Sequence, residues 1–301
     1  MRDVHALAPT HDRLRLSRVG VTAVKKPLVV QRPGRQVSLS VSFSVAVDLP
    51  STRKGSDLSR NAELLAEVVD WTAQHPVQSL EAACSAIARE LLVRHPYATN
   101  SEVLGEAEYF APRGITPARR SLEDFQLFAE ATARRGEQGT ITVQRSIGAE
   151  AVGMTACPCA METARAKLEK EFPLLADPSL KALPIVTHNQ RNRTRLLFDL
   201  SEDAEVEVDA ILDAIEGAQS SPTYAILKRG DEADVVLTAH RHPKFVEDVV
   251  RDLLASIPSR FASLPDATGV RVRTVSEESI HKYDVTSSHA TTLGELRSPA
   301  A

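Results

Sequence analysis

The sequence predicts an α+β protein in which antiparallel strands form sheets that helices cover on one face. The first observation is the segment QVSLSVSFSVAVDL, residues 36–49, where large apolar residues alternate with mostly small or polar ones, as in a long half-buried strand. The second is a change to helical spacing after Lys54-Gly55-Ser56. The third is that this order of strands and helices recurs in the second half of the chain.

The first half supplies four strands and two helices in this interpretation. GVTAVKKPLVV predicts an antiparallel partner for the first strand, with the turn residues PGRQ between them. Ser56 is the expected N-cap of one helix, and a second helix is expected from Ser79 to about Arg94. Further strands are expected near 102–111 and 138–147, on either side of an Arg- and Glu-rich segment from Arg119 to Gln138.

The second half repeats this order. A strand is expected over 194–200, helices over 202–219 and 243–257, and another strand over 270–275. Pro243 suits the first turn of its helix. We therefore predict two tandem units, 1–150 and 151–301, with the second carrying most of a metal site.

Composition limits the classes of function. The chain has 301 residues, 43% hydrophobic and 25% charged, and a formal charge of -4. No global basic surface supports extended nucleic-acid binding, and we expect no nucleic-acid partner. No apolar run is long enough for a membrane helix, and the first residues lack the apolar stretch of a secretory signal. An odd count of three cysteines fits a reducing compartment, so we expect a cytoplasmic protein without membrane contact.

The segment GMTACPCAMETARAKLEKEF places Cys157 directly before a helical pattern. A thiol at a helix N-terminus loses its proton more easily, which suits a metal ligand or a nucleophile. The alternative is a pair of buried structural thiols, Cys157 and Cys159. Three thiols cannot form a four-cysteine zinc site, and Cys84 lies on an apolar helical stripe and is expected in the core. A single metal with a thiolate, an imidazole and an open position remains possible.

Two histidines are candidates for the same site. His188 precedes a turn rich in Asn and Arg, where clustered guanidinium groups suit a phosphate-bearing substrate, although solvated loop charges are the alternative. His281 follows a predicted strand end, and Glu277 and Glu278 either orient it or are ordinary exposed carboxylates. His242 is expected to be a cap or surface residue.

Eight segments, in order along nearly the whole chain, resemble the type IB and archaeal GTP cyclohydrolases. These segments are VGVTAVKKP, KGSDLSR, GMTACPCA, THNQR, SPTYAILKR, HPKFVEDVVRD, SEESIH and TLGELR. The resemblance implies the tunnelling fold and a hydrolase that opens the guanine imidazole ring of GTP at C8, releases formate and leads to a dihydroneopterin phosphate for folate or pterin pathways. It also implies one divalent metal per site, Fe²⁺, Zn²⁺ or Mn²⁺, and a homo-oligomer, expected to be a tetramer, with sites between subunits.

By position, the resemblance makes Cys157 and His188 the metal ligands and gives Cys157 and His281 the catalytic roles. A histidine near its ordinary pKa can move the protons that ring opening requires. The expected substrate-binding residues are Gln190, Arg191, Lys228 and Arg229.

Departures from the family pattern leave the substrate open. Asp57 and Tyr283 stand where the family has histidines, and Pro222 and Leu237 stand where type IB members carry glutamates. In one alternative, Asp234 or Glu232 supplies the carboxylate that hydrogen-bonds the guanine edge in the family. In the other, the chain is a paralogue that acts on another purine-like or pterin-like substrate. A third alternative is a non-catalytic binding protein that keeps the fold.

Overall fold

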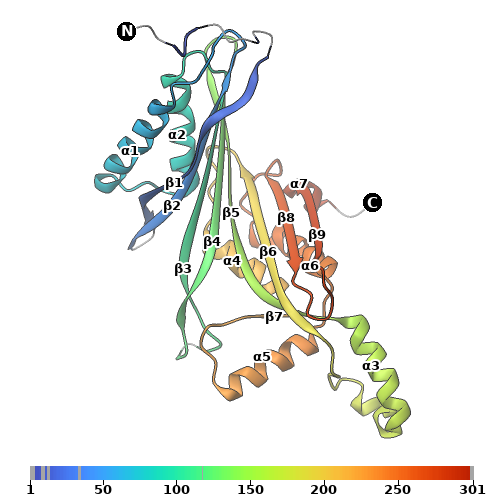
Figure 1. Ribbon diagram of the computed structural model, residues 1–301. Coiled ribbons are helices and arrows are strands. Elements are labelled where there is room, and N and C mark those ends of the chain that lie inside the picture. Colours follow the sequence, from blue (N-terminus) through green and yellow to red (C-terminus); the bar gives the residue numbers. More distant parts are fainter. Residues whose placement is uncertain (1–3, 8–10, 12–13, 33–34, 117, 299–301) are drawn as a thin grey trace. The chain divides into compact units, whose positions relative to one another are not determined.

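The computed structural model describes residues 4–7, 11, 14–32, 35–116 and 118–298 (Figure 1). The chain forms two compact units. Unit 1 comprises Met1–Tyr109, Gln126–Ile147 and Asp199–Glu205, and unit 2 comprises Phe110–Phe125, Gly148–Phe198 and Val206–Ala301. Several long strands contribute residues to both units, and the expected division at residue 150 stays a prediction.

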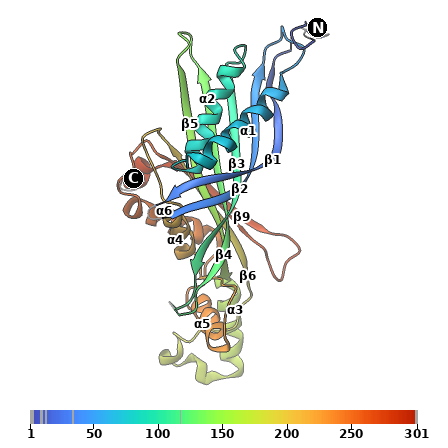
Figure 2. The same ribbon diagram turned by 90° about the vertical axis from the view of Figure 1, so that its left-hand side faces the viewer.

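Unit 1 contains a sheet covered by two helices. Its elements are β1 (Leu16–Arg32), β2 (Arg35–Leu49), α1 (Leu58–Gln74), α2 (Leu80–Arg94) and the unit 1 portions of β3 (Asn100–Arg113), β4 (Ser121–Arg135) and β5 (Ile141–Ala156). The strands are hydrogen-bonded in the order β1-β2-β3-β4-β5, and β1 pairs antiparallel with β2, as predicted. Figure 2 shows α1 and α2 beside the strands of this unit.

The core of unit 1 follows the alternation seen in the sequence. Leu39, Val41, Phe43, Val45 and Val47 of β2 are all buried. Leu64 and Leu65 of α1 and Ile87 and Leu91 of α2 are almost fully buried as well. Burial of large apolar side chains on one sheet face is the main stabilising term for such a layer.

Two expectations for unit 1 are wrong. Asp57, not Ser56, is the N-cap of α1, and the Ser56 hydroxyl lies 2.8 Å from the Tyr97 hydroxyl instead. The Arg- and Glu-rich segment expected to separate two strands is itself strand β4. Its inward residues include Ala129, Ala131 and Ala133, so the alternation is carried by small side chains that give a weak apolar signal.

Unit 2 contains the remaining helices and strands. Its further elements are α3 (Pro158–Glu171), two short 3₁₀ helices (Pro173–Ala176 and Pro178–Leu180), β6 (Asn189–Leu200), α4 (Val208–Ala218), β7 (Ser221–Pro222), α5 (Arg229–Arg241), α6 (Val246–Arg260), β8 (Gly269–Ser276), β9 (Val285–Thr292) and α7 (Leu293–Arg297). The order is β3-β4-β5-β6-β8-β9, with β7 paired to β5, and β8 and β9 are antiparallel.

The sequence located most elements of unit 2 but not all of them. The helix expected from Pro243 begins at Val246, so Pro243 lies before its first turn. Helix α5 and strand β9 were not expected. Within the described residues, no helix is long and apolar enough to span a membrane.

Candidate active site

A cavity of about 210 Å³ in unit 2 brings together the three residues expected to do the chemistry, Cys157, His188 and His281. Gln190 and Glu278 also line it. The remaining lining residues are Thr155, Lys244, Phe245, Val246, Glu247, Ser276, Tyr283 and Val285.

Cys157 stands where β5 ends and α3 begins. It is the N-cap of α3, Pro158 fills the first helical position, and the Cys157 sulfur accepts a hydrogen bond from the backbone N–H of Ala160 at 3.5 Å. The backbone N–H of Cys157 donates to the carbonyl oxygen of His188 at 3.1 Å. This bond holds the residue before β6 against the start of α3.

The ring of His188 is held in one tautomer by its neighbours. The Gln190 amide nitrogen donates to the Glu278 carboxylate at 3.2 Å and to the Thr155 hydroxyl at 3.1 Å. A carboxylate only accepts, so the amide oxygen of Gln190 must face His188 Nδ1, which lies 2.9 Å away. Nδ1 therefore carries a proton, which leaves Nε2 as the ring nitrogen that can ligate a metal.

Glu278 reinforces this arrangement. Its side chain is only 9% exposed, and its second oxygen lies 3.6 Å from His188 Nδ1. The two alternatives for Glu278 from the sequence are therefore both wrong, because this carboxylate is buried and orients His188 rather than His281. Glu277 is half-exposed and forms an ion pair with Arg193 at 2.7 Å.

His281 faces His188 across the cavity. The two ring centroids are 6.3 Å apart and the rings are perpendicular. Tyr283, in place of the second histidine of the family segment, stacks on His281 with centroids 5.0 Å apart. Stacking restricts the orientation of the His281 ring without adding a charge.

Two side chains of the cavity, Cys157 and His188, carry donor atoms that suit a metal ion. A histidine that ligates through Nε2 almost always donates its other N–H to an acceptor, as His188 does here, and a thiol and an imidazole suit Zn²⁺ or Fe²⁺. Within the described residues, however, no three His, Cys, Asp or Glu side chains form a group that could hold a metal ion. Cys157 and His188 are the two donors that the sequence predicted for this cavity, and Glu247, Glu278 and His281 line it as well.

A second cavity of unit 2, about 730 Å³, holds one expected substrate-binding residue that the first cavity lacks. Arg191 lines it, and Gln190 lines both cavities. Lys228 and Arg229 are exposed at the start of α5 and line neither. The backbone N–H of Lys228 donates to buried Asp231 at 2.9 Å.

The carboxylates expected to replace Leu237 do not reach these cavities. Leu237, Glu232 and Asp234 are exposed on α5 and line neither cavity. The carboxylates that line the larger cavity are Glu123 and Asp124, which the sequence did not single out. Glu123 accepts the backbone N–H of Ala225 at 3.0 Å.

Two other expectations have clear outcomes. Cys84 is fully buried and burial raises the pKa of its thiol, so it is a core residue. His242 is the C-cap of α5. The functional residue that sequence reasoning missed is Glu278 as the partner of Gln190, and its position two residues past the end of β8 was the available signal.

Comparison with solved structures identifies the fold. A uricase from Bacillus fastidious matches 93% of this chain and 94% of its own, with a TM-score of 0.54 and 10% identity. Uricase from Arthrobacter globiformis covers 92% of this chain and 93% of its own, with a TM-score of 0.50 and 8% identity. At this identity the likeness concerns the fold alone, and it confirms the predicted tunnelling fold.

Comparison of sequences identifies the family. The family model described as type I GTP cyclohydrolase folE2 matches residues 1–287. GTP cyclohydrolase MptA 2 of Methanocella arvoryzae is 41% identical over 292 residues, covering 94% of each chain. GTP cyclohydrolase MptA of Methanococcoides burtonii is 42% identical over 303 residues, covering 98% of this chain and 95% of its own. The chain therefore belongs to the type I GTP cyclohydrolase folE2 family, whose members are hydrolases.

Proposed function

We propose that this protein is a metal-dependent GTP cyclohydrolase that opens the guanine imidazole ring at C8 and releases formate, leading to a dihydroneopterin phosphate. The family match and the relatives named GTP cyclohydrolase support the substrate. The observation that carries the proposal is the single cavity that unites Cys157, His188 and His281.

Cys157 and His188 would hold one divalent metal, Fe²⁺, Zn²⁺ or Mn²⁺. The metal, when bound, would supply Lewis acidity and lower the pKa of water for attack at C8. The role of this chain is to keep the thiol at the start of α3 and the His188 Nε2 lone pair facing one cavity. A homo-oligomer, proposed as a tetramer with sites between subunits, would supply the remaining donors from a second copy or from water.

His281 is proposed as the proton-transfer residue. Hydrolysis at C8 adds water across a carbon–nitrogen bond, so ring nitrogens must gain protons as the bonds to C8 break. An imidazole can both donate and accept a proton, which suits both directions of transfer. The His281 ring stands across the cavity from His188, and Tyr283 stacks against it.

Substrate contacts are proposed from the neighbouring cavity. Gln190 lines both cavities, and Arg191 adds a guanidinium to the larger one, which suits a phosphate oxygen. Lys228 and Arg229 are proposed as phosphate contacts that form only in the assembled oligomer, because neither side chain lines a cavity of unit 2.

The proposal is tested by anaerobic incubation of the protein with GTP and each of iron(II), manganese and zinc. Formate and a pterin that fluoresces after oxidation should appear with at least one metal, and Cys157→Ala should lose both the products and the bound metal. Cys159→Ala is the matched control, because Cys159 is exposed on the first turn of α3 and lines neither cavity of unit 2.

Two other results would assign a different function. If the protein binds metal but releases no formate with any of the three metals, GTP is excluded as the substrate. The protein would then be a paralogue that acts on another purine-like or pterin-like substrate. No bound metal in the wild type, with no change in Cys157→Ala, would indicate a non-catalytic binding protein.

A further inference from the structure

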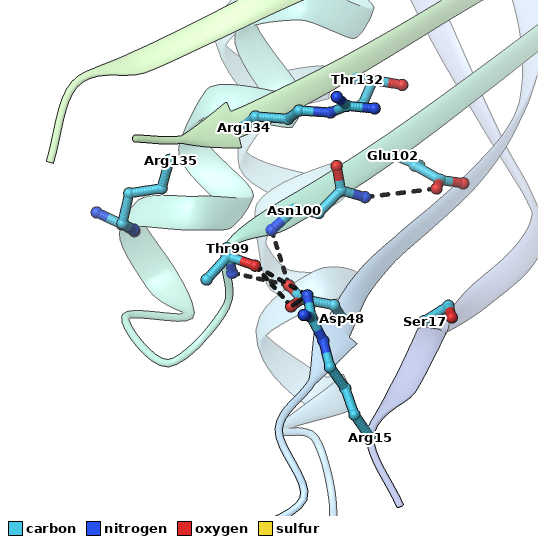
Figure 3. Close-up of a pocket in the computed structure, with 9 residues that line it drawn as sticks. All are labelled: Arg15, Ser17, Asp48, Thr99, Asn100, Glu102, Thr132, Arg134 and Arg135. Atoms are coloured by element: carbon cyan, nitrogen blue, oxygen red, sulfur yellow. Dashed lines mark hydrogen bonds and ion pairs between the residues drawn. The ribbon is translucent and has the colours of Figure 1, made fainter. Parts of the chain in front are cut away.

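Unit 1 contains a cavity of about 600 Å³ lined only by polar side chains (Figure 3). The lining residues are Arg15, Ser17, Asp48, Thr99, Asn100, Glu102, Thr132, Arg134 and Arg135. Cavities for drug-like molecules are mostly apolar. A cavity without any apolar or aromatic side chain suits a small, strongly polar ligand.

Part of the lining comes from the sheet face opposite the core, while Arg135 stands on the same face of β4 as buried Ala133 and donates to the end of α2. Inward residues of β4 alternate with outward ones, so that Leu127, Ala129, Ala131 and Ala133 are buried while Arg134 is exposed. Thr132 and Arg134 are two residues apart and therefore share the outward face. In Figure 3 both side chains lie above Asn100 and Glu102.

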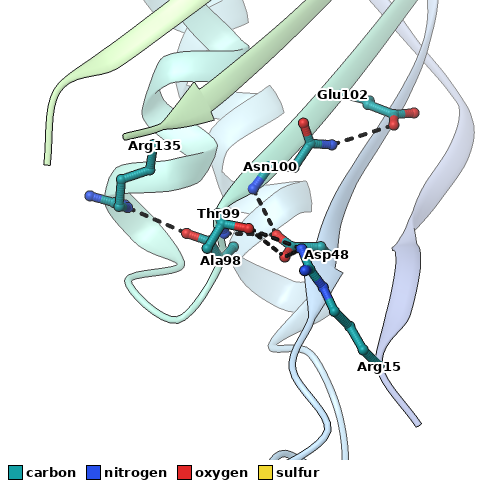
Figure 4. A network of polar contacts seen from close by, with 7 residues as sticks. All are labelled: Arg15, Asp48, Ala98, Thr99, Asn100, Glu102 and Arg135. Carbon is teal, nitrogen blue, oxygen red and sulfur yellow. Dashed lines mark hydrogen bonds and ion pairs between the residues drawn. The ribbon is translucent and has the colours of Figure 1, made fainter. Parts of the chain in front are cut away.

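The two carboxylates of this cavity are already satisfied. Asp48 accepts the backbone N–H groups of Thr99 and Asn100 at 2.8 and 2.7 Å, and it accepts Arg15 Nη2 at 2.5 Å (Figure 4). Glu102 pairs with Arg18 at 2.9 Å. Asp48 therefore has no oxygen lone pair left, whereas Glu102 keeps part of its accepting capacity but is already paired with the cation of Arg18.

Two guanidinium groups are left without a carboxylate partner. Among the described residues, neither Arg134 nor Arg135 forms an ion pair. Arg135 donates to the carbonyl oxygens of Leu92 and Ala98 at 2.6 and 3.3 Å, which fixes its direction and leaves donors unused. The cavity therefore carries an excess of positive charge on a framework that is partly fixed before any ligand arrives.

Size and chemistry indicate an extended anion. A volume of about 600 Å³ equals roughly 20 water molecules at about 30 Å³ each, far more than one carboxylate needs. Guanidinium groups bind phosphate oxygens in pairs, and hydroxyl and amide donors complete such sites. We propose that this cavity binds a polyphosphate chain, with Arg134 as its main ligand and Arg135, Thr132 and Ser17 as further donors.

Two sources of the phosphates fit this chemistry. One is the triphosphate of GTP bound at the Cys157–His188 site of a second copy, and this source rests on the proposed function. The other is a free nucleotide or inorganic polyphosphate bound independently of turnover.

The test uses inorganic triphosphate as the probe and isothermal titration calorimetry on the full chain. Arg134→Gln removes the exposed guanidinium and should weaken triphosphate binding about 10- to 100-fold, the loss expected for a charged hydrogen-bond donor. Binding by the wild type should also weaken with added salt. Lys25→Gln is the matched control, because Lys25 is an exposed cation of β1 that does not line the cavity, and it should bind as the wild type does. Equal triphosphate affinity in Arg134→Gln and wild type, or no binding by either, overturns the proposal.

Turnover of GTP separates the two sources. If Arg134→Gln raises the KM for GTP and leaves kcat unchanged, the result supports phosphate binding in the unit 1 cavity. The bound phosphates are then those of GTP at the site of a second copy. If the KM for GTP is unchanged while triphosphate binding is weaker, the result also supports phosphate binding in the cavity. The ligand is then a free nucleotide or inorganic polyphosphate that binds independently of turnover. If no GTP is turned over at all, the proposed function fails. The triphosphate titration still shows whether the unit 1 cavity binds phosphates.

Discussion

The orientation of His188 depends on the Glu278 carboxylate, which acts through the amide of Gln190. Glu278 fixes the amide of Gln190, and the amide fixes the proton on His188 Nδ1. An outer partner of this kind commonly changes metal affinity by a factor of about 10 to 100. At the scale of single residues, this chain of hydrogen bonds fixes the orientation that the proposed ligand role of His188 requires.

Replacement of the carboxylate tests this chain. In Glu278→Gln an amide can present either an oxygen or a nitrogen to Gln190, so the His188 tautomer is no longer fixed and metal affinity should fall about tenfold. Glu277→Gln is the matched control, since Glu277 is half-exposed and pairs with Arg193. Metal titrations that give the same affinity for both variants and the wild type would show that Glu278 has no positioning role.

The ionised carboxylate of Asp48 leads to a second prediction for a single residue, on how stability depends on pH. Burial alone would raise the pKa of Asp48, but hydrogen bonds from Asn100, Thr99 and Arg15 outweigh it and hold the pKa below its ordinary value of 3.8. A lowered pKa contributes stability above the unfolded-state pKa, and this contribution is lost as pH falls through the folded-state pKa.

Asp48→Asn should therefore cost roughly 1–3 kcal/mol of unfolding free energy near pH 7, the usual cost of losing charged hydrogen bonds. Urea denaturation should show this difference from the wild type shrinking as the pH falls below about 4. A difference that stays constant down to about pH 3 would be incompatible with an ionised Asp48 as the stabilising group.

The site residues differ in how well the sequence revealed them. Cys157 and His188 stand in short motifs with distinctive chemistry, and the structure places both in one cavity. Glu278 lies in a run of similar acidic residues, and only the hydrogen-bonded geometry separates it from Glu277. Ser56 met the rule for an N-cap, but its hydroxyl is used by Tyr97 instead.

Helix α2 begins where the sequence predicted, and its cap can be measured. The Ser79 hydroxyl accepts the backbone N–H of Ala82 at 3.2 Å. Ser79→Ala removes this acceptor from a buried helix end and should lower the unfolding free energy by about 1 kcal/mol. Ser59→Ala, an exposed change within α1, should have no destabilising effect since alanine favours helix. If chemical denaturation gives the two variants equal unfolding free energies, the Ser79 side chain does not stabilise the start of α2.

Among whole elements, periodicity located those with large apolar side chains. Strand β2 and helix α2 were predicted nearly to their ends, since buried leucines, valines and isoleucines mark their inner faces. Strand β4 was missed because alanines form much of its inner face, and β9 because few of its side chains are apolar or buried. Helix α5 buries only Asp231, Val235 and Ala239, which leaves almost no apolar stripe to detect.

For the whole molecule, the tunnelling fold and the family are established by the comparisons, while the metal and the product are proposals. The α+β class was predictable from the order of strands and helices along the chain, and the tunnelling fold from the resemblance of eight segments to a known family. The proposed metal site was predictable only as far as Cys157 and His188, which stand in recognisable motifs, because the described residues contain no group of three candidate ligands.

The central claim is that the protein breaks the guanine ring of GTP at C8 with the help of Cys157. The most direct test is NMR of a reaction with GTP labelled with carbon-13 at C8, in the presence of the metal that the protein binds. The account predicts that the labelled carbon appears as formate with the wild type and stays in the purine ring with Cys157→Ala. A metal-loaded wild type that leaves the label in the intact ring would contradict it.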